Sequence, residues 1–274
     1  MNREQKIISR IKEHYNEALK RYDESRIVGV FCQGSPNYNL DYEKSDIDTK
    51  LILTPSLEDI IFNRKPISTT HILDNEEHLD AKDIRLYINT FKKQNINFLE
   101  ILFTPFKIVN PLYAKWWNKL EANRERIARY NEYQAVKAMK GVAMEKYRAM
   151  EHPYPSKVDI IAEYGYDGKQ VSHLLRIEDY LRRYINGHTY EACLIPSYNA
   201  RPRIMEYKKQ EVPLAVARIE ASESIERIKQ MADSFTACNA NQPDPYIDEL
   251  FNSVQRDIVK FAIALELVEE EYFD

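Results

Sequence analysis

A Gly-Ser turn followed closely by an Asp-x-Asp pair most constrains what this chain can fold into. Gly34 and Ser35 form the turn, Asp46 and Asp48 form the pair, and an apolar run lies on each side of the segment. Side chains two residues apart on an extended chain point the same way. Two carboxylates at a strand edge favour a hard cation such as Mg²⁺, and a small turn lets backbone N–H groups approach a phosphate. The segment therefore predicts metal-assisted chemistry on a nucleotide.

The overall composition limits the class of protein but indicates no specific function. A chain of 274 residues can form one large domain or two modest ones. Its hydrophobic share of 44% and charged share of 30% are typical of a soluble globular protein. The net charge of −4 argues against a protein that coats nucleic acid by charge alone, although a local basic groove is compatible with it.

Nothing in the sequence indicates a membrane or a secretory route. No apolar run approaches the length of a membrane span, and the N-terminus leads into a charged amphipathic segment unlike a signal peptide. The cysteines are odd in number and scattered, which fits a reducing cytoplasm, so we expect a cytoplasmic protein. They are Cys32, Cys193 and Cys238.

Hydrophobic periodicity predicts an α+β protein with a change of character near residue 108. The first part alternates short apolar strands with helical stripes, and the second part is helical almost throughout. We therefore expect a small mixed β-sheet domain over residues 1–108 and an all-helical domain over residues 109–274. The expected strands cover 27–32, 49–53, 68–73 and 78–81, and the expected helices cover 5–22, 56–62, 84–94, 112–150, 168–186, 211–233 and 245–270.

The motifs together resemble the DNA polymerase β-type nucleotidyltransferase superfamily. Its members carry Gly-Ser on a turn after the first strand, Asp-x-Asp on the next strand and a third carboxylate on a later strand. The closer resemblance is to a bacterial and phage branch of predicted nucleotidyltransferases, which reads Tyr-Gly-Leu and then Ser-Asp-x-Asp. Here Tyr38-Asn39-Leu40 and Ser45-Asp46-Ile47-Asp48 have the same spacing. Asn39 replaces the usual glycine, and asparagine tolerates a left-handed backbone.

The resemblance implies transfer of a nucleoside monophosphate from an NTP to an acceptor hydroxyl by two Mg²⁺ or Mn²⁺ ions. Asp46 and Asp48 would coordinate both ions, and Gly34 and Ser35 would contact the β- and γ-phosphates. The acceptor could be an RNA end, a small molecule or a protein side chain. Weak overall acidity disfavours a long nucleic-acid acceptor.

The third carboxylate has two candidates in the sequence. Asp83 is the first choice and Asp80 the second, and they cannot both point to one face of a strand because they are an odd number of positions apart. Asp83 would complete the catalytic and metal-binding set. An equally weighted interpretation makes Asp83 the N-cap of the helix that follows it.

A predicted helix in the second half supplies candidate nucleotide-binding residues. Lys169, His173 and Arg176 fall at i, i+4 and i+7, so they share one helix face that could bind phosphates. The region from 169 to 176 also resembles a helix of the same branch. The alternative is a solvated face on which Arg176 pairs with Glu178 or Asp179.

Two other functions stay open from the sequence. The chain could be a catalytically inactive member that binds a nucleotide or RNA as an interaction module. It could also be a sugar-nucleotide transferase that uses Asp-x-Asp for a metal. That class usually needs several parallel strands before the motif, and only one strand is expected before Asp46.

Overall fold

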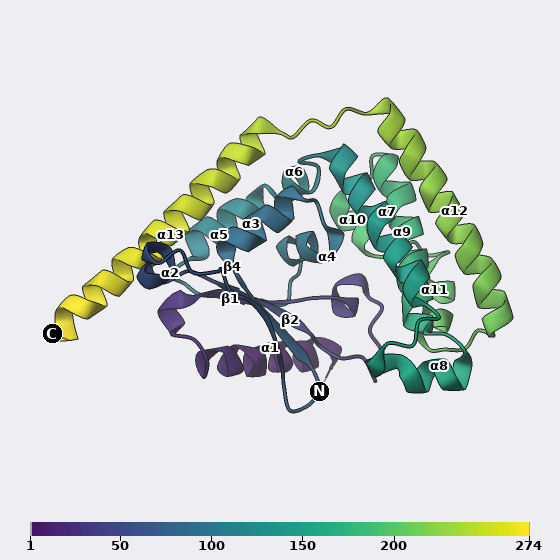
Figure 1. Ribbon diagram of the computed structural model, residues 1–274, viewed down its shortest axis with the longest axis horizontal. Helices are drawn as coiled ribbons and strands as arrows, with labels where there is room; N and C mark the ends of the chain where they lie inside the picture. Colours follow the sequence, from purple (N-terminus) through teal and green to yellow (C-terminus); the bar gives the residue numbers. More distant parts are fainter. Residues whose placement is uncertain (1, 274) are drawn as a thin grey trace. The chain divides into compact units, whose positions relative to one another are not determined.

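The computed structural model describes residues 2–273, with side chains described through residue 268, and it confirms the α+β class (Figure 1). The chain divides into two compact units. Unit 1 comprises residues 1–130 and 243–274, and unit 2 comprises residues 131–242. This division differs from the expected boundary at 108. The last helix belongs with the sheet because it packs on helices of unit 1.

A five-stranded mixed sheet organises unit 1, in the order β3-β4-β2-β1-β5. Strands β2 and β4 run parallel, and the other neighbours are antiparallel. The expected strands 27–32 and 49–53 are confirmed. The edge strand β5 was not expected, because three residues are too few to show an alternation. The strands are β1 (Ile27–Cys32), β2 (Thr49–Leu53), β3 (Ser68–Ile72), β4 (His78–Asp83) and β5 (Lys107–Val109).

Several helices of unit 1 begin at residues whose side chains cap them. Ser56 and Asp59 form a capping box at α2, and the last helix begins at Pro245, the expected first residue. The helices are α1 (Arg3–Leu19), α2 (Leu57–Ile61), α3 (Ile84–Lys92), α4 (Ile96–Leu99), α5 (Ala114–Ala122), α6 (Arg124–Ala128) and α13 (Pro245–Phe273), with 3₁₀ helices at Glu24–Arg26, Ser35–Tyr38 and Glu100–Leu102. Among the described residues, no helix has both the length and the apolar character to cross a membrane.

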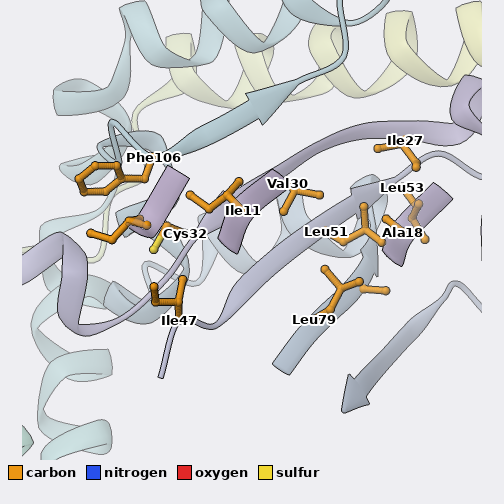
Figure 2. Close-up of a cluster of buried hydrophobic side chains, with 12 residues drawn as sticks. Ile11, Ala18, Ile27, Val30, Cys32, Ile47, Leu51, Leu53, Leu79 and Phe106 are labelled. Carbon is orange, nitrogen blue, oxygen red and sulfur yellow. The ribbon is translucent and has the colours of Figure 1, made fainter. Parts of the chain in front are cut away.

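One face of the sheet is buried under α1. Ile11 of α1 packs with Val30 of β1, Leu51 of β2 and Leu79 of β4 in a cluster of buried apolar side chains (Figure 2). Ile47, which precedes β2, belongs to the same cluster. On the opposite face, the Lys50 ammonium of β2 lies 4.3 Å from the ring centroid of Phe98 in α4.

Unit 2 contains helices joined by loops and, among the described residues, no strand. Its long helix α9 packs against α7, α11 and α12. The single helix expected over 112–150 is instead three, because the chain turns after α5 and again before Asn131, whose side chain caps α7. The helices are α7 (Glu132–Ala149), α8 (Val158–Tyr164), α9 (Gly168–Ile185), α10 (Tyr190–Leu194), α11 (Arg201–Lys208) and α12 (Leu214–Cys238), with a 3₁₀ helix at Pro155–Lys157.

Candidate active site

The Gly-Ser turn lies directly beside the Asp-x-Asp pair. The backbone N–H of Gln33 donates to the carbonyl of Asp48 at 3.0 Å, which extends the β1–β2 ladder by one pair beyond Cys32 and Thr49. Gly34 then turns the chain at φ +80° and ψ −143°, a conformation that side-chain-bearing residues rarely adopt. The turn and the pair, which are separate in the sequence, thus meet where β1 ends and β2 begins.

Both aspartates lie outside the apolar core that α1 covers. Ile47 between them is 4% exposed in the core, whereas Asp46 is exposed and Asp48 is partly exposed. One carboxylate oxygen of Asp48, Oδ1, accepts the backbone N–H of His78 at 2.9 Å. Asp46 has no hydrogen bond or ion pair to any other residue that the structure describes. The expected common direction of the two carboxylates fits this burial pattern.

A buried polar network fixes the backbone between the two aspartates. The Glu77 carboxylate accepts the backbone N–H of Ile47 at 3.2 Å and the guanidinium of Arg10 at 2.7 Å. It also lies 2.9 Å from Nε2 of His14, whose other ring nitrogen is 2.7 Å from the Thr49 hydroxyl. These contacts join α1 to Thr49 directly and to Ile47 through Glu77. Sequence reasoning missed Glu77, because its partners are distant along the chain and no local pattern marks it.

Glu77 is expected to make stability fall in acid. Burial raises the pKa of its carboxyl group, but hydrogen bonds from Arg10, Asn75 and His14 outweigh burial and lower that pKa from 4.5 to about 2. A depressed folded-state pKa stabilises the protein above pH 4.5, and this stabilisation is lost as the pH falls toward 2. We expect it to be worth about 3 kcal/mol.

The free energy of unfolding in urea, compared for wild type and Glu77→Gln between pH 7 and pH 3, measures this contribution. Wild type should be the more stable at pH 7, and the difference should shrink below pH 4.5, the ordinary pKa of the group. The exposed neighbour Glu76 gives a matched control, because Glu76→Gln makes the same chemical change on a side chain that is not buried. A pH-independent difference for Glu77→Gln would contradict the assignment.

Asp80 lies on the same face as the pair. It is the register partner of Lys50 in the parallel β2–β4 ladder, and Lys50 is two residues beyond Asp48. Asp80 Oδ2 accepts from Lys50 Nζ and from Gln33 Nε2, each at 3.3 Å, and Oδ1 accepts from the Thr70 hydroxyl at 2.5 Å. Burial raises the pKa of the carboxyl group, but Thr70 and Lys50 outweigh burial and lower it, so Asp80 is a carboxylate at neutral pH.

Asp83, the first-choice third carboxylate, is not brought to the pair. Its register partner is Leu53 at the far end of β2. Its Oδ1 accepts the backbone N–H of Arg85 at 2.8 Å, and its Oδ2 accepts the Arg85 guanidinium at 2.7 Å. Asp83 is the N-cap of α3 with a side chain 2% exposed, so the capping interpretation fits and the metal-binding one does not.

Gly34 and Ser35 differ in what they could offer a phosphate. The Gly34 N–H donates to Glu100 Oε1 at 3.0 Å, and the Tyr38 hydroxyl donates to Glu100 Oε2. A buried carboxylate that sequence reasoning missed therefore already occupies the Gly34 amide. The backbone N–H and hydroxyl of Ser35 have no partner among the described residues, and Ser35 is partly exposed. Ser35 is the better phosphate donor of the two.

The loop between the turn and the pair has the expected local geometry. Asn39 has φ +54° in the left-handed region, as expected where the branch carries glycine. Arg3 of α1 donates to Asp41 at 2.7 Å and to the carbonyl of Pro36 at 3.0 Å. The Asn37 side chain donates to the Cys32 carbonyl at 2.9 Å. These contacts tie the loop to α1 and to the end of β1.

The expected cationic face of α9 belongs to unit 2. Lys169 is exposed, His173 is partly buried and Arg176 is 3% exposed, so the three are not equally open to a ligand. Burial lowers the pKa of His173 well below its usual range, and the charges of Arg176 and Lys169 lower it further. His173 is therefore neutral at pH 7 and supplies no positive charge.

The alternative partners proposed for Arg176 are engaged elsewhere. Glu178 accepts from Arg182 at 2.6 Å and from Arg227 at 2.7 Å. Asp179 accepts from Arg183 at 2.6 Å. These ion pairs organise the packing of α9 within unit 2, and the three residues of the expected phosphate-binding face stay a prediction.

The carboxylate groups beside the Gly-Ser turn are suited to bind a divalent ion. Among the described residues, no three His, Cys, Asp or Glu side chains are already gathered around one point. Mg²⁺ is commonly held by one or two carboxylates together with substrate phosphates, so such a trio is not required. Asp46 is exposed without a partner, and the hydrogen bond from His78 engages Oδ1 of Asp48 rather than Oδ2, so this pair fits the ion.

Comparison with known proteins adds no assignment. The chain matches no protein-family model, and a search of the curated proteins finds no match either. The functional interpretation therefore depends on the residues and their geometry.

Proposed function

We propose that the protein is a metal-dependent nucleotidyltransferase that moves a nucleoside monophosphate from an NTP to an acceptor hydroxyl. The observation that carries the proposal is the Gln33–Asp48 hydrogen bond, which sets the Gly34-Ser35 turn beside the aspartate pair. Asp80 on the adjacent parallel strand faces the same side and supplies the third carboxylate in place of Asp83.

The proposed reaction forms one P–O bond and breaks another. The acceptor oxygen attacks the α-phosphorus, the bond from that phosphorus to the bridging oxygen breaks, and pyrophosphate leaves with the electron pair. The hydroxyl proton passes to water. Divalent ions held by Asp46 and Asp48 would neutralise the charge on the attacking and leaving oxygens. Ser35 binds the leaving phosphates, and Asp80 accepts a hydrogen bond from the acceptor hydroxyl and orients it.

Incubation with each of the four NTPs, labelled at the α-phosphate, tests the proposal. With Mg²⁺ or Mn²⁺ we expect label to appear on the protein, on RNA or on a small-molecule fraction, with one pyrophosphate released per transfer. EDTA should abolish both signals. Pyrophosphate release without metal, or no label on any acceptor with either metal, would contradict the proposal.

The second candidate is a nucleotide- or RNA-binding module without catalysis. One observation favours it: Asp83, the first-choice third carboxylate, caps α3 and lies away from the aspartate pair. The same labelling experiment separates the two functions. Metal-dependent NTP binding without pyrophosphate release is the result that the binding module predicts.

A further inference from the structure

A cavity of about 260 Å³ opens on the sheet beside Asp80. Residues of β2, β3 and β4 form its floor, and Tyr87 of α3 and Phe98 of α4 line it. All of these residues belong to unit 1. Asp80 lines the cavity, and only β2 separates its strand, β4, from β1, which leads into the Gly-Ser turn. An acceptor bound in the cavity would therefore meet the third carboxylate.

The cavity has an excess of positive charge. Lys50 is 4% exposed with Nζ 3.3 Å from Asp80, and Lys82 has no ion pair among the residues that the structure describes. The ammonium groups of both lysines lie 4.3 Å from the ring centroid of Phe98, which holds them in place. Two ammonium groups thus face one carboxylate, and an anion bound here would compensate the second charge.

A buried hydroxyl without a hydrogen-bond partner is a second indication of a ligand site. Tyr87 is fully buried and lines the cavity, and its hydroxyl has no hydrogen-bond partner among the described residues. Burial raises the pKa of Tyr87 well above its usual value, so the group stays a donor at neutral pH. A buried hydroxyl without a partner is costly, and a ligand oxygen would satisfy it.

We propose that this cavity binds the phosphate group of a small phosphorylated acceptor, whose hydroxyl receives the nucleotidyl group at Asp80. Lys50, Lys82 and Tyr87 line the cavity, and each can donate a hydrogen bond to an oxygen of a phosphate monoester. A volume of about 260 Å³ is below that of typical sites for larger ligands, which favours a small molecule over a polymer. The acceptor role rests on the proposed function, whereas phosphate binding itself does not.

Calorimetric titration with methyl phosphate, in EDTA and without NTP, tests the site. Wild type should bind, and Lys82→Met should weaken binding by about tenfold or more because it removes a charged donor. The exposed Lys65, outside the cavity, is the matched control, and Lys65→Met should bind like wild type. Tyr87→Phe, which keeps the packing and removes only the hydroxyl, should weaken binding by about threefold or more.

Three results would overturn the proposal. They are no binding of methyl phosphate by folded wild type, equal binding by Lys82→Met, and binding of a 5′-phosphorylated oligonucleotide more than about tenfold tighter than methyl phosphate through Lys82. Because the titration contains neither metal nor NTP, its failure is distinguishable from failure of nucleotidyl transfer. Phosphate binding without transfer in the labelling experiment would remove the acceptor role while leaving the site.

Discussion

Replacing Asp48 with asparagine is expected to reduce nucleotidyl transfer by about a thousandfold or more, and Asp46→Asn should do the same. Each substitution keeps the size and removes the negative charge that would hold a divalent ion. Loss of that ion removes several kcal/mol of transition-state stabilisation, and about 4 kcal/mol corresponds to a thousandfold in rate. Pyrophosphate release under saturating NTP and Mg²⁺ measures the effect.

The fold should survive these substitutions. Asp46 is exposed, and in Asp48→Asn the backbone N–H of His78 can still donate to the oxygen of the introduced amide. The exposed Asp74 in the β3–β4 connection offers a matched control, because Asp74→Asn makes the same chemical change away from the pair. Transfer within about threefold of wild type by Asp48→Asn would argue against a metal role for the pair.

Alanine at position 80 and alanine at position 83 are expected to have opposite effects. Asp80→Ala should lower transfer by about a hundredfold or more, because Asp80 shares the face of the pair and Lys50. Asp83→Ala should leave transfer within about threefold but lower the free energy of unfolding by about 1–2 kcal/mol, because it removes the α3 cap. Steady-state transfer rates and urea unfolding of both variants measure the two effects.

Each of these two variants is a control for the other. They stand three positions apart on one strand, so they share secondary structure while pointing to opposite faces. If Asp83→Ala abolished transfer and Asp80→Ala left it unchanged, the assignment of the third carboxylate would be reversed. Equal losses in both would indicate a general effect on β4 and not on the acceptor.

Local signals in the sequence were enough to predict the centre of the sheet. The apolar runs at 27–32 and 49–53 became β1 and β2 with the expected bounds. Ile47 is the reason that the Asp-x-Asp pattern is informative, because one apolar side chain between two acids anchors the alternation to the core. The left-handed backbone at Asn39 could also be predicted locally, because it depends on the residue type at that one position.

Contacts between distant segments could not be predicted from the sequence. The choice between Asp80 and Asp83 depends on the register of β4 against β2, and no local pattern reveals a register between parallel strands. Glu77 and Glu100 are acids whose roles arise from partners more than 60 positions away, at Arg10, His14 and Gly34. No local sequence pattern marks a single acidic residue that becomes buried.

Helix ends and unit boundaries were also set by packing. The continuous helical pattern over 112–150 conceals two turns, because polar residues such as Asn123 and Asn131 fit both a helix surface and a cap. The last helix joins unit 1 through contacts with α3 and α5, which are far from it in sequence. The change in composition near residue 108 did not indicate that this helix belongs to unit 1.

A crystal structure with Mg²⁺ and a non-hydrolysable NTP analogue tests the central claim most directly. We predict a divalent ion bound by carboxylate oxygens of Asp46 and Asp48, with the triphosphate against Ser35. An ion bound elsewhere, or a triphosphate that contacts neither Ser35 nor the pair, would contradict the proposed metal site.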